Sequence, residues 1–209
     1  MGAVGCANDP PSAIVGVDVA GCDPGIEHGS GAFVEVAGRQ VVLTAAHTLR
    51  GARDITVTRG AERASAHIVG FDPEMDLAYL EVDGMRAPTP LPVDSTGVRE
   101  GDTGRVYVVR SGEVVTLPVT ITRRINIRTE DIYVDGETLR PGYELRVGIE
   151  GGDSGGPVVV GTDVIGVVWA RSRRAGDRAY AIDPVRAGDR ITHQLVTGHL
   201  DDVDLGRCS

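Results

Sequence analysis

The sequence predicts an all-β protein made of two six-stranded antiparallel β-barrels followed by a C-terminal helix. Three observations lead to this prediction. Short runs of β-branched and other apolar residues recur along most of the chain, and turn residues separate them at a spacing typical of barrels. A proline-rich stretch at residues 87–92 divides these runs into two series. One helical pattern follows the second series, near the end of the chain.

The first series predicts a barrel over residues 13–84. Residues 7–12, Ala-Asn-Asp-Pro-Pro-Ser, favour irregular structure, so residues 1–12 are expected to form an N-terminal tail. The next run, Ile-Val-Gly-Val-Asp-Val, is β-branched and alternates, as a half-buried strand does. The six expected strands lie at residues 14–19, 31–36, 40–44, 54–59, 64–71 and 78–82.

The second series predicts a barrel over residues 104–183, after a connector at residues 85–103. Its six expected strands lie at residues 104–110, 113–124, 145–149, 157–160, 164–170 and 179–182. A helical pattern then covers residues 184–195, with Asp183 as the expected N-cap. The helix and a tail are expected to occupy residues 184–209.

Composition narrows the classes of function. The 209 residues suffice for one large core or two small ones, and the net charge of −9 argues against a nucleic-acid partner. No apolar run approaches the length of a membrane span, so stable membrane insertion is not expected. Four histidines lack metal-ligand spacing with any cluster of acidic residues or cysteines, so we expect no metal site: His28, His67, His193 and His199.

The most informative stretch is the turn from Gly151 to Pro157, Gly-Gly-Asp-Ser-Gly-Gly-Pro. Glycine permits positive φ and a close approach of other backbone segments. A tight turn of this composition can direct the N–H groups of Gly152 and Ser154 into one small space, as an oxyanion hole requires. Taken alone, the stretch could also be a glycine-rich hairpin between two strands.

A serine nucleophile needs a base, and the base needs an orienting group. His47 ends the run Thr-Ala-Ala-His at the end of an expected strand, and Asp76 opens the apolar run that begins at Leu77. Each residue alone is more often structural, but the order His47, Asp76, Ser154 is one of the known orders of a Ser-His-Asp triad.

These stretches resemble a trypsin-like serine protease of the chymotrypsin fold. Within that group, the chain is most similar to the bacterial HtrA-like proteases and to the periplasmic acid-resistance proteases of actinobacteria. The resemblance reaches across about two thirds of the chain and rests on four stretches: residues 29–34 (Gly-Ser-Gly-Ala-Phe-Val), residues 44–47, residues 71–78 (Phe-Asp-Pro-Glu-Met-Asp-Leu-Ala) and residues 151–157. It implies that both barrels form one peptidase domain.

The resemblance also implies a role for each matching residue. Ser154 would attack the scissile carbonyl, His47 would move the proton, and Asp76 would hold the imidazole. The N–H groups of Gly152 and Ser154 would receive the oxyanion. Asp153 needs a cationic partner if it is buried, and the sequence does not say which residue supplies it. Ile14-Val15-Gly16 is similar to the mature N-terminus of trypsins, but we favour the strand because the HtrA-like relatives need no such cleavage.

The substrate cleft is expected on two segments that flank the nucleophile turn, by analogy with the family. One wall would be Val168, Trp169, Ala170 and Arg171, and the other would be Gly148, Ile149, Glu150 and Gly151. Gly148 stands six residues before the serine, where an aspartate would select basic side chains, so a trypsin-like preference for Lys or Arg is not implied.

The chain has three cysteines, Cys6, Cys22 and Cys208, which allow three pairings. A Cys22–Cys208 disulfide would close the longest loop within the expected ordered region, and the resemblance favours this pair too. Such a bond would indicate an extracytoplasmic location: secreted, periplasmic or attached to the cell envelope. Residues 3–6, Ala-Val-Gly-Cys, faintly resemble a lipoprotein cleavage box, which would anchor a lipid at Cys6; the alternative is a tail with a free thiol.

The leading hypothesis is a monomeric, extracytoplasmic serine endopeptidase that acts on peptides or proteins without a cofactor. The alternative is a protease-fold binding module that is catalytically weak, or latent until its redox state or the pH changes. The presence of His47, Asp76 and Ser154 favours the enzyme, since binding modules usually lose a member of the triad.

Overall fold

The computed structural model describes residues 11–21, 25–172, 174–200 and 205. Its first barrel consists of six strands in the order β1-β2-β3-β6-β5-β4, and pairing of β1 with β4 closes it. The strands are β1 (Ile14–Ala20), β2 (Ile26–Val36), β3 (Arg39–Thr44), β4 (Asp54–Arg59), β5 (Glu62–Asp72) and β6 (Leu77–Val82). The short 3-10 helix η1 (Ala46–Leu49) follows β3.

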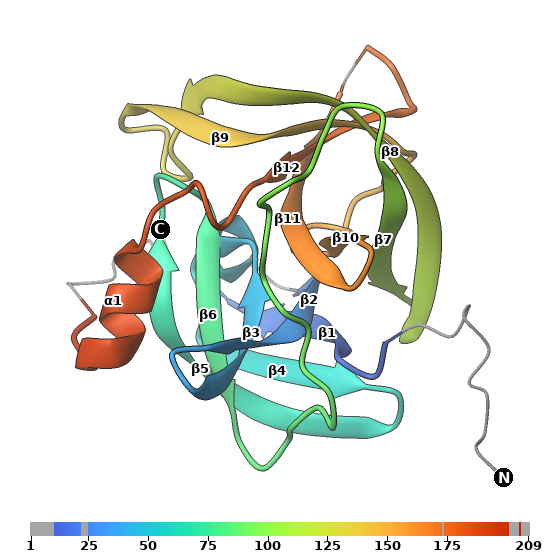
Figure 1. Ribbon diagram of the computed structural model, residues 1–209. Coiled ribbons are helices and arrows are strands. Elements are labelled where there is room, and N and C mark those ends of the chain that lie inside the picture. Colours follow the sequence, from blue (N-terminus) through green and yellow to red (C-terminus); the bar gives the residue numbers. More distant parts are fainter. Residues whose placement is uncertain (1–10, 22–24, 173, 201–204, 206–209) are drawn as a thin grey trace, which may run out of the picture.

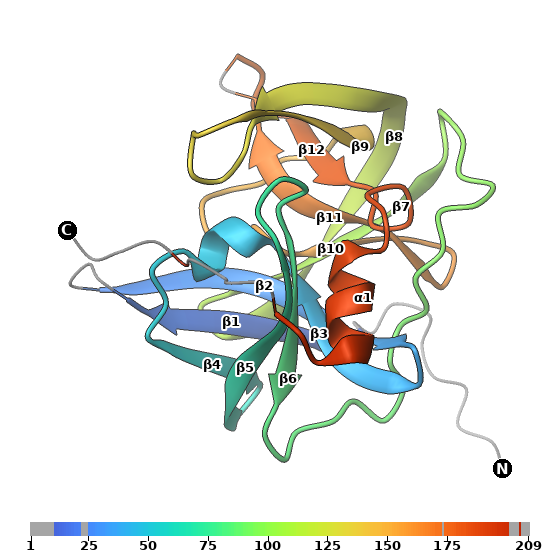
Figure 2. The same ribbon diagram turned by 90° about the vertical axis from the view of Figure 1, so that its left-hand side faces the viewer.

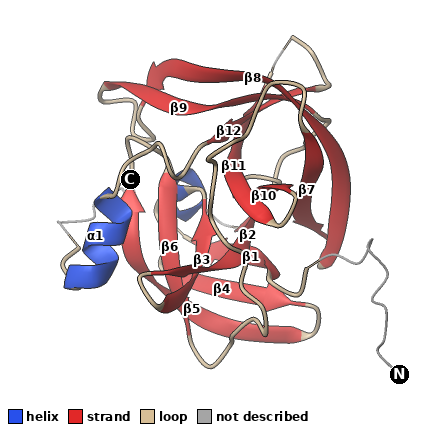
Figure 3. Cartoon of the chain, in the orientation of Figure 1, coloured by secondary structure: helices blue, strands red, loops and turns tan. Residues whose placement is uncertain are grey.

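The second barrel has the order β10-β11-β12-β9-β8-β7, and β10 pairs with β7 to close it. Its strands are β7 (Thr103–Arg110), β8 (Glu113–Glu130), β9 (Glu137–Arg146), β10 (Pro157–Val160), β11 (Asp163–Arg171) and β12 (Arg178–Ile182). Helix α1 (Arg190–Thr197) follows. The predicted all-β architecture of two six-stranded antiparallel barrels and a C-terminal helix is confirmed (Figure 3).

Each barrel encloses a core of small branched side chains, as expected for a chain with so few aromatic residues. In both barrels the alternating apolar residues of neighbouring strands point inward and exclude water. Fully buried examples are Val17, Phe33, Val42 and Leu80 in the first barrel and Val106, Val158, Ile165 and Val168 in the second. The barrels meet where β1 and β2 contact β7 (Figure 1).

The segment between β6 and β7 touches both barrels. Leu91 bridges to Val34 of β2, and Val93 bridges to Val164 of β11. Further hydrogen bonds join the Leu91 N–H to the Phe33 carbonyl and the Val164 N–H to the Pro92 carbonyl, at 2.9 and 2.8 Å. The connector therefore helps to hold the two barrels against each other.

Two predicted boundaries in the second barrel were wrong. The strand expected at residues 113–124 continues to Glu130, and its partner β9 covers residues 137–146 rather than 145–149. The extra residues pair with each other from Ile125 and Gly142 outward to Glu130 and Glu137. On β8, Ile125 and Ile127 alternate with exposed polar residues, but the facing part of β9 buries Thr138, Arg140 and Pro141. Polar residues and a proline at buried positions do not give the apolar pattern by which a strand is recognised.

The predicted start of the helix was also wrong, because Asp183 has another role. Its buried carboxylate accepts hydrogen bonds from the Tyr143 hydroxyl at 2.8 Å and from the N–H groups of Val185 and Arg186. Those bonds stabilise a turn, and α1 begins only at Arg190. Figure 2 shows α1 against the first barrel, where it contacts β5 and β6.

The Gln194 side chain fixes α1 to the first barrel, since its Oε1 accepts the Phe71 N–H at 2.7 Å. Within the described parts of the chain, neither α1 nor any other helix is long and apolar enough to cross a bilayer.

Candidate active site

His47 lies in η1, directly after β3, and faces the turn that joins β5 to β6. Asp76 ends that turn in a left-handed conformation, with φ of 57°, which short polar side chains tolerate better than most. The Asp76 Oδ1 atom accepts the backbone N–H of His47 at 2.7 Å, and the Ala46 N–H donates to the Asp76 carbonyl. The two segments are therefore joined by backbone as well as side-chain bonds.

A continuous chain of hydrogen bonds joins the three residues. His47 Nδ1 lies 2.8 Å from Asp76 Oδ2, and His47 Nε2 lies 2.9 Å from Ser154 Oγ. An ionised carboxylate can only accept hydrogen bonds, which assigns the imidazole proton to Nδ1. The unprotonated Nε2 then accepts the Ser154 hydroxyl, as a general base must.

Asp76 determines the protonation behaviour of this histidine. Burial by itself would lower the pKa of the His47 imidazole, but the hydrogen bond and the charge of Asp76 outweigh burial and raise it above 6.5. The Asp76 side chain is 2% exposed, and the His47 side chain is 34% exposed. The carboxylate is thus shielded, while the imidazole reaches the surface where a substrate would bind.

The nucleophile turn packs tightly against the first barrel. The Ser154 carbonyl accepts the Ser30 N–H at 2.7 Å. Gly155 has φ of +85°, and a Cβ there would lie 2.0 Å from the Ser30 carbonyl oxygen. Gly152 also has a positive φ, +92°. Position 155 therefore requires glycine for both its backbone conformation and the lack of space, and position 152 requires glycine for its backbone conformation.

Arg110 is the partner of Asp153 that the sequence left unassigned. Arg110 Nε–H donates to Asp153 Oδ1 at 3.0 Å, and Nη2–H donates to Oδ2 at 2.6 Å. Asp153 is fully buried, and the Glu150 N–H donates to its Oδ2 at 2.7 Å. This two-point ion pair between β7 and the nucleophile turn holds the residue next to Ser154 in place.

The N–H groups of Gly152 and Ser154 donate to no acceptor within the described residues. The neighbouring Asp153, Gly155 and Gly156 N–H groups, in contrast, donate to carbonyls at 3.4, 2.8 and 3.1 Å. Within the described residues, the two N–H groups expected to bind an oxyanion therefore have no protein acceptor.

Both expected cleft walls lie next to this turn. Val168 exchanges hydrogen bonds with it, since the Gly155 N–H donates to the Val168 carbonyl and the Val168 N–H donates to the Gly156 carbonyl. The ladder between β11 and β12 is irregular between Val168 and Ala170, which places Trp169 at a bulge. Ala170 and Arg171 end β11.

On the other wall, residues 148–151 join β9 to the turn. Ile149 is buried, and Gly148, Glu150 and Gly151 are exposed.

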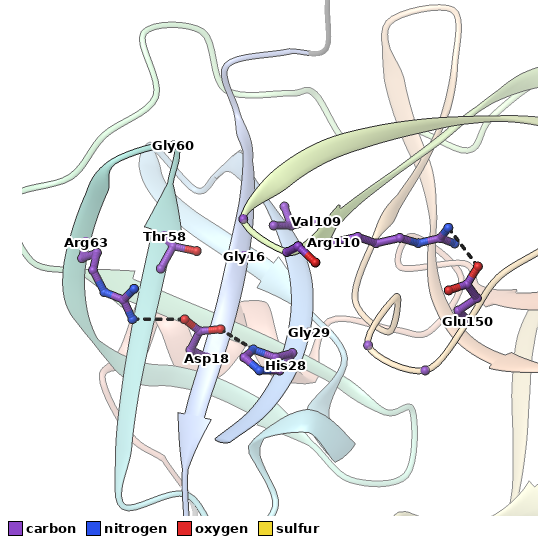
Figure 4. Close-up of a pocket in the computed structure, with 14 residues that line it drawn as sticks. Gly16, Asp18, His28, Gly29, Thr58, Gly60, Arg63, Val109, Arg110 and Glu150 are labelled. Carbon is purple, nitrogen blue, oxygen red and sulfur yellow. Dashed lines mark hydrogen bonds and ion pairs between the residues drawn. The ribbon is translucent and has the colours of Figure 1, made fainter. Parts of the chain in front are cut away.

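A pocket of about 590 Å³ opens beside Gly152, between the barrels. Figure 4 shows its charged groups in two clusters. Asp18 contacts His28 at 2.7 Å and Arg63 at 3.3 Å on the first barrel. Arg110 contacts Glu150 at 3.1 Å on the second. His28, for which the sequence indicates no metal-binding role, thus lines a pocket next to the nucleophile turn.

Sequence reasoning missed two arginines of the site, Arg110 and Arg140. Arg110 pairs with Asp153, and Arg140 Nη1 lies 3.7 Å from Asp76 Oδ2. Both arginines come from distant parts of the chain, and no local pattern distinguishes them from surface arginines. The predicted Cys22–Cys208 disulfide and the possible anchor at Cys6 lie outside the described residues. The described residues hold no group of three or more His, Cys, Asp or Glu that could bind a metal ion.

Comparisons with known proteins place the chain in a family. A family model described as a trypsin-like peptidase domain matches residues 29–167. Serine protease Rv3671c of Mycobacterium tuberculosis is 32% identical over 162 residues, which is 76% of this chain and 38% of that protein. A probable periplasmic serine endoprotease, DegP-like, of Pseudomonas putida is 30% identical over 173 residues, which is 80% of this chain and 34% of that protein.

Solved structures agree with these relatives. The crystal structure of the active form of the M. tuberculosis Rv3671c protease superposes with a TM-score of 0.80 at 26% identity, and covers 94% of this chain and 86% of that chain. The HtrA-type protease AlgW shares the fold, with a TM-score of 0.74. The chain spans well under half the length of the curated relatives that it matches. On this sequence and structural similarity, the chain belongs to the trypsin-like peptidase family.

Proposed function

We propose that this chain is a serine endopeptidase that cleaves peptide bonds through a triad of Ser154, His47 and Asp76. The observation that carries the proposal is the unbroken hydrogen-bond chain from Asp76 through His47 to Ser154 Oγ, at 2.8 and 2.9 Å. Family membership supports it, since the named relatives are serine proteases. Both barrels supply members of the triad, so we propose that residues 13–183 and the C-terminal helix act as one peptidase domain.

The reaction proceeds in two steps. Ser154 Oγ attacks the scissile carbonyl carbon while His47 Nε2 takes the hydroxyl proton, and Asp76 stabilises the imidazolium that forms. His47 then donates that proton to the leaving amine as the peptide bond breaks, which leaves an acyl-enzyme on Ser154. Water attacks the ester with His47 again as the base, and the acid product departs with Ser154 regenerated.

The oxyanion of each tetrahedral intermediate is bound by the Gly152 and Ser154 N–H groups in this proposal. Their freedom from protein acceptors supports the assignment, because an oxyanion hole must be formed before charge develops. Arg110 contributes indirectly: it fixes Asp153 between the two donors and so keeps both N–H groups aligned.

The substrate backbone is proposed to pair with the end of β11. β10 pairs with β11 only as far as Val167, so the edge beyond that residue is not covered by β10. Trp169, Ala170 and Arg171 would lie along the peptide, and the segment from Gly148 to Gly151 would face them. Residues beyond the cleaved bond would pass Gly152 toward the pocket in Figure 4.

We propose an extracytoplasmic location, since a DegP-like relative is periplasmic by name. A Cys22–Cys208 disulfide would suit that compartment. Alkylation in denaturant without a reductant tests for this disulfide. If Cys22 and Cys208 are paired, one of the three cysteines reacts; if they are not, all three react. Membrane release by lipase or by detergent would test a lipid anchor at Cys6.

Labelling with a serine-directed fluorophosphonate tests the proposed function. The probe should phosphonylate the parent chain and leave Ser154→Ala unlabelled, because only an activated serine reacts. Ser12→Ala is the matched control and should label like the parent. A folded parent that does not react would instead favour a weak or latent binding module.

A further inference from the structure

Arg140 is a buried arginine that crosses from the second barrel to the turn carrying Asp76. Its side chain extends from β9 and is 2% exposed. Its Nε–H donates to the Glu74 carbonyl at 2.6 Å, and Nη2–H donates to the Pro73 carbonyl at 3.3 Å. One guanidinium therefore fixes the two carbonyls that precede Asp76 by two and three residues.

The same guanidinium lies between the triad carboxylate and the cleft wall. Its Nη1 atom is 3.7 Å from Asp76 Oδ2, the oxygen that accepts the His47 Nδ1–H. Its carbon lies 4.9 Å from the centre of the Trp169 ring, a cation–π contact. Asp76 is itself 2% exposed, so water screens this ion pair little.

The charges around the pair can be named. Asp76, Asp72 and Asp131 face Arg140 and favour its charged form, although burial is the largest influence and lowers its pKa. An arginine nonetheless stays protonated in proteins. Asp76 and Glu27 act on His47 to raise its pKa, while the positive charge of Arg140 lowers it.

We propose that Arg140 is a positioning residue for the catalytic triad: it fixes the turn that carries Asp76, and its positive charge beside the Asp76 carboxylate opposes the pull of that carboxylate on the His47 proton. This inference rests on the proposed function, in which Asp76 orients the catalytic base. Arg140 touches neither the substrate nor the reacting atoms, so it acts through Asp76.

Removal of the Arg140 charge should raise the pKa of His47. Without Arg140, the negative charge of Asp76 acts on His47 with no opposing positive charge, so the imidazolium form is favoured. We expect the acid limb of kcat/KM to move up by about one pH unit, which is about tenfold in rate at any pH below both midpoints. The pH-independent kcat should also fall, since the turn loses a fixed partner, while KM changes little.

The test uses Arg140→Gln in the full chain, with a fluorogenic peptide as the substrate. Glutamine keeps an N–H donor for the Glu74 carbonyl and removes the charge. Arg124→Gln is the matched control, because Arg124 also lies on this hairpin, pairs with the buried Asp183 at 3.2 Å and stacks on Tyr143. The control should lower stability without moving the acid limb.

A structural role alone predicts a different result. Arg140→Gln would then lower the melting temperature, and would lower the activity by the same factor at every pH. An acid limb at the wild-type position in the folded variant would overturn the proposal. NMR titration of the His47 Nδ1 proton gives the same midpoint without any turnover. It therefore separates failure of this inference from failure of the proposed function, which would show as a parent chain that does not react with the fluorophosphonate.

Arg140→Lys carries the test if the glutamine variant does not fold. Lysine keeps the positive charge but cannot donate to the Glu74 and Pro73 carbonyls as a planar fork, so the acid limb should stay in place. The pH-independent kcat should fall roughly tenfold, as expected when one good hydrogen bond is lost. A wild-type kcat in this variant would overturn the proposal.

Discussion

Replacement of Arg110 by methionine should weaken the proposed peptidase activity by releasing Asp153, the residue between the two proposed oxyanion donors. The change keeps the aliphatic stem and removes both hydrogen bonds to Asp153, which is fully buried. Two unit charges about 3 Å apart interact by roughly 5 kcal/mol at an effective dielectric constant of 20. Because the Arg110 side chain is 29% exposed, and the Glu150 N–H still donates to Asp153, we take a net loss of about 3 kcal/mol.

That loss would appear mainly in activity. A buried Asp153 carboxylate without its cation is unfavourable, and its movement toward water should displace Gly152 and Ser154. If the active turn is disfavoured by about 3 kcal/mol, kcat/KM should fall about 100-fold. Steady-state assays with a fluorogenic peptide measure this, and urea unfolding should show a loss of stability no larger than about 3 kcal/mol.

A double-mutant cycle with Asp153→Asn gives the decisive comparison. The two single changes remove the same ion pair, so the double variant should be better than their sum by about 2 kcal/mol or more. Arg128→Met is the control: its pair with Glu137 is more than three-fifths exposed on each side, and its loss should change stability by about 0.5 kcal/mol or less. Additive effects, or an Arg110→Met enzyme within twofold of the parent, would refute the role given to Arg110.

Three further outcomes are expected. Gly155→Ala would place a Cβ 2.0 Å from a carbonyl oxygen of β2 and should destabilise the protein by roughly 3 kcal/mol or more. Gly161 has open space around it, so Gly161→Ala should cost about 1 kcal/mol from its positive φ alone. Urea unfolding of both variants measures the difference. The pKa of His47 is raised, so the acid limb of kcat/KM should lie above 6.5. Relative to His47→Gln, the parent should gain stability as the pH falls through that raised pKa and should keep the gain below pH 6.5. A stability difference that grows with rising pH would contradict this direction. Tyr143→Phe removes the hydroxyl whose pKa burial and Asp183 raise to about 12, and should destabilise the fold by about 1–2 kcal/mol in thermal unfolding; an unchanged melting temperature would show that Asp183 is satisfied without it.

The sequence predicted the parts of the fold that depend on local patterns. The strands with apolar alternation were located within a few residues, because a period of two side chains marks a strand that is buried on one face. The outer half of the hairpin between β8 and β9 could not be found this way, since its β9 strand buries a threonine, an arginine and a proline, Thr138, Arg140 and Pro141, in place of alternating apolar residues. The start of α1 was also misplaced, because Asp183 resembles a helix cap although tertiary contacts with Tyr143 and Arg124 bury it.

The candidate triad could be assigned from sequence because each member lies in a short motif whose order identifies it. The same reasoning could not find Arg110 or Arg140, which lie in ordinary strand sequences. The need for a cation beside Asp153 did follow from the chemistry of a buried charge. Which of the arginines meets that need depends on how the barrels close, and closure brings together residues more than 40 positions apart.

The two buried carboxylates of the candidate active site are each paired with an arginine. Asp76 is the proposed orienting member of the triad, and Asp153 directly precedes Ser154. Each has an arginine from a strand of the second barrel, Arg140 on β9 and Arg110 on β7. Arg110 secures a turn of its own barrel, but Arg140 secures a turn of the first. The position of Asp76 relative to Ser154 therefore depends on a contact across the barrel interface. A change that shifts one barrel against the other should alter the pH dependence of kcat/KM before it unfolds either barrel.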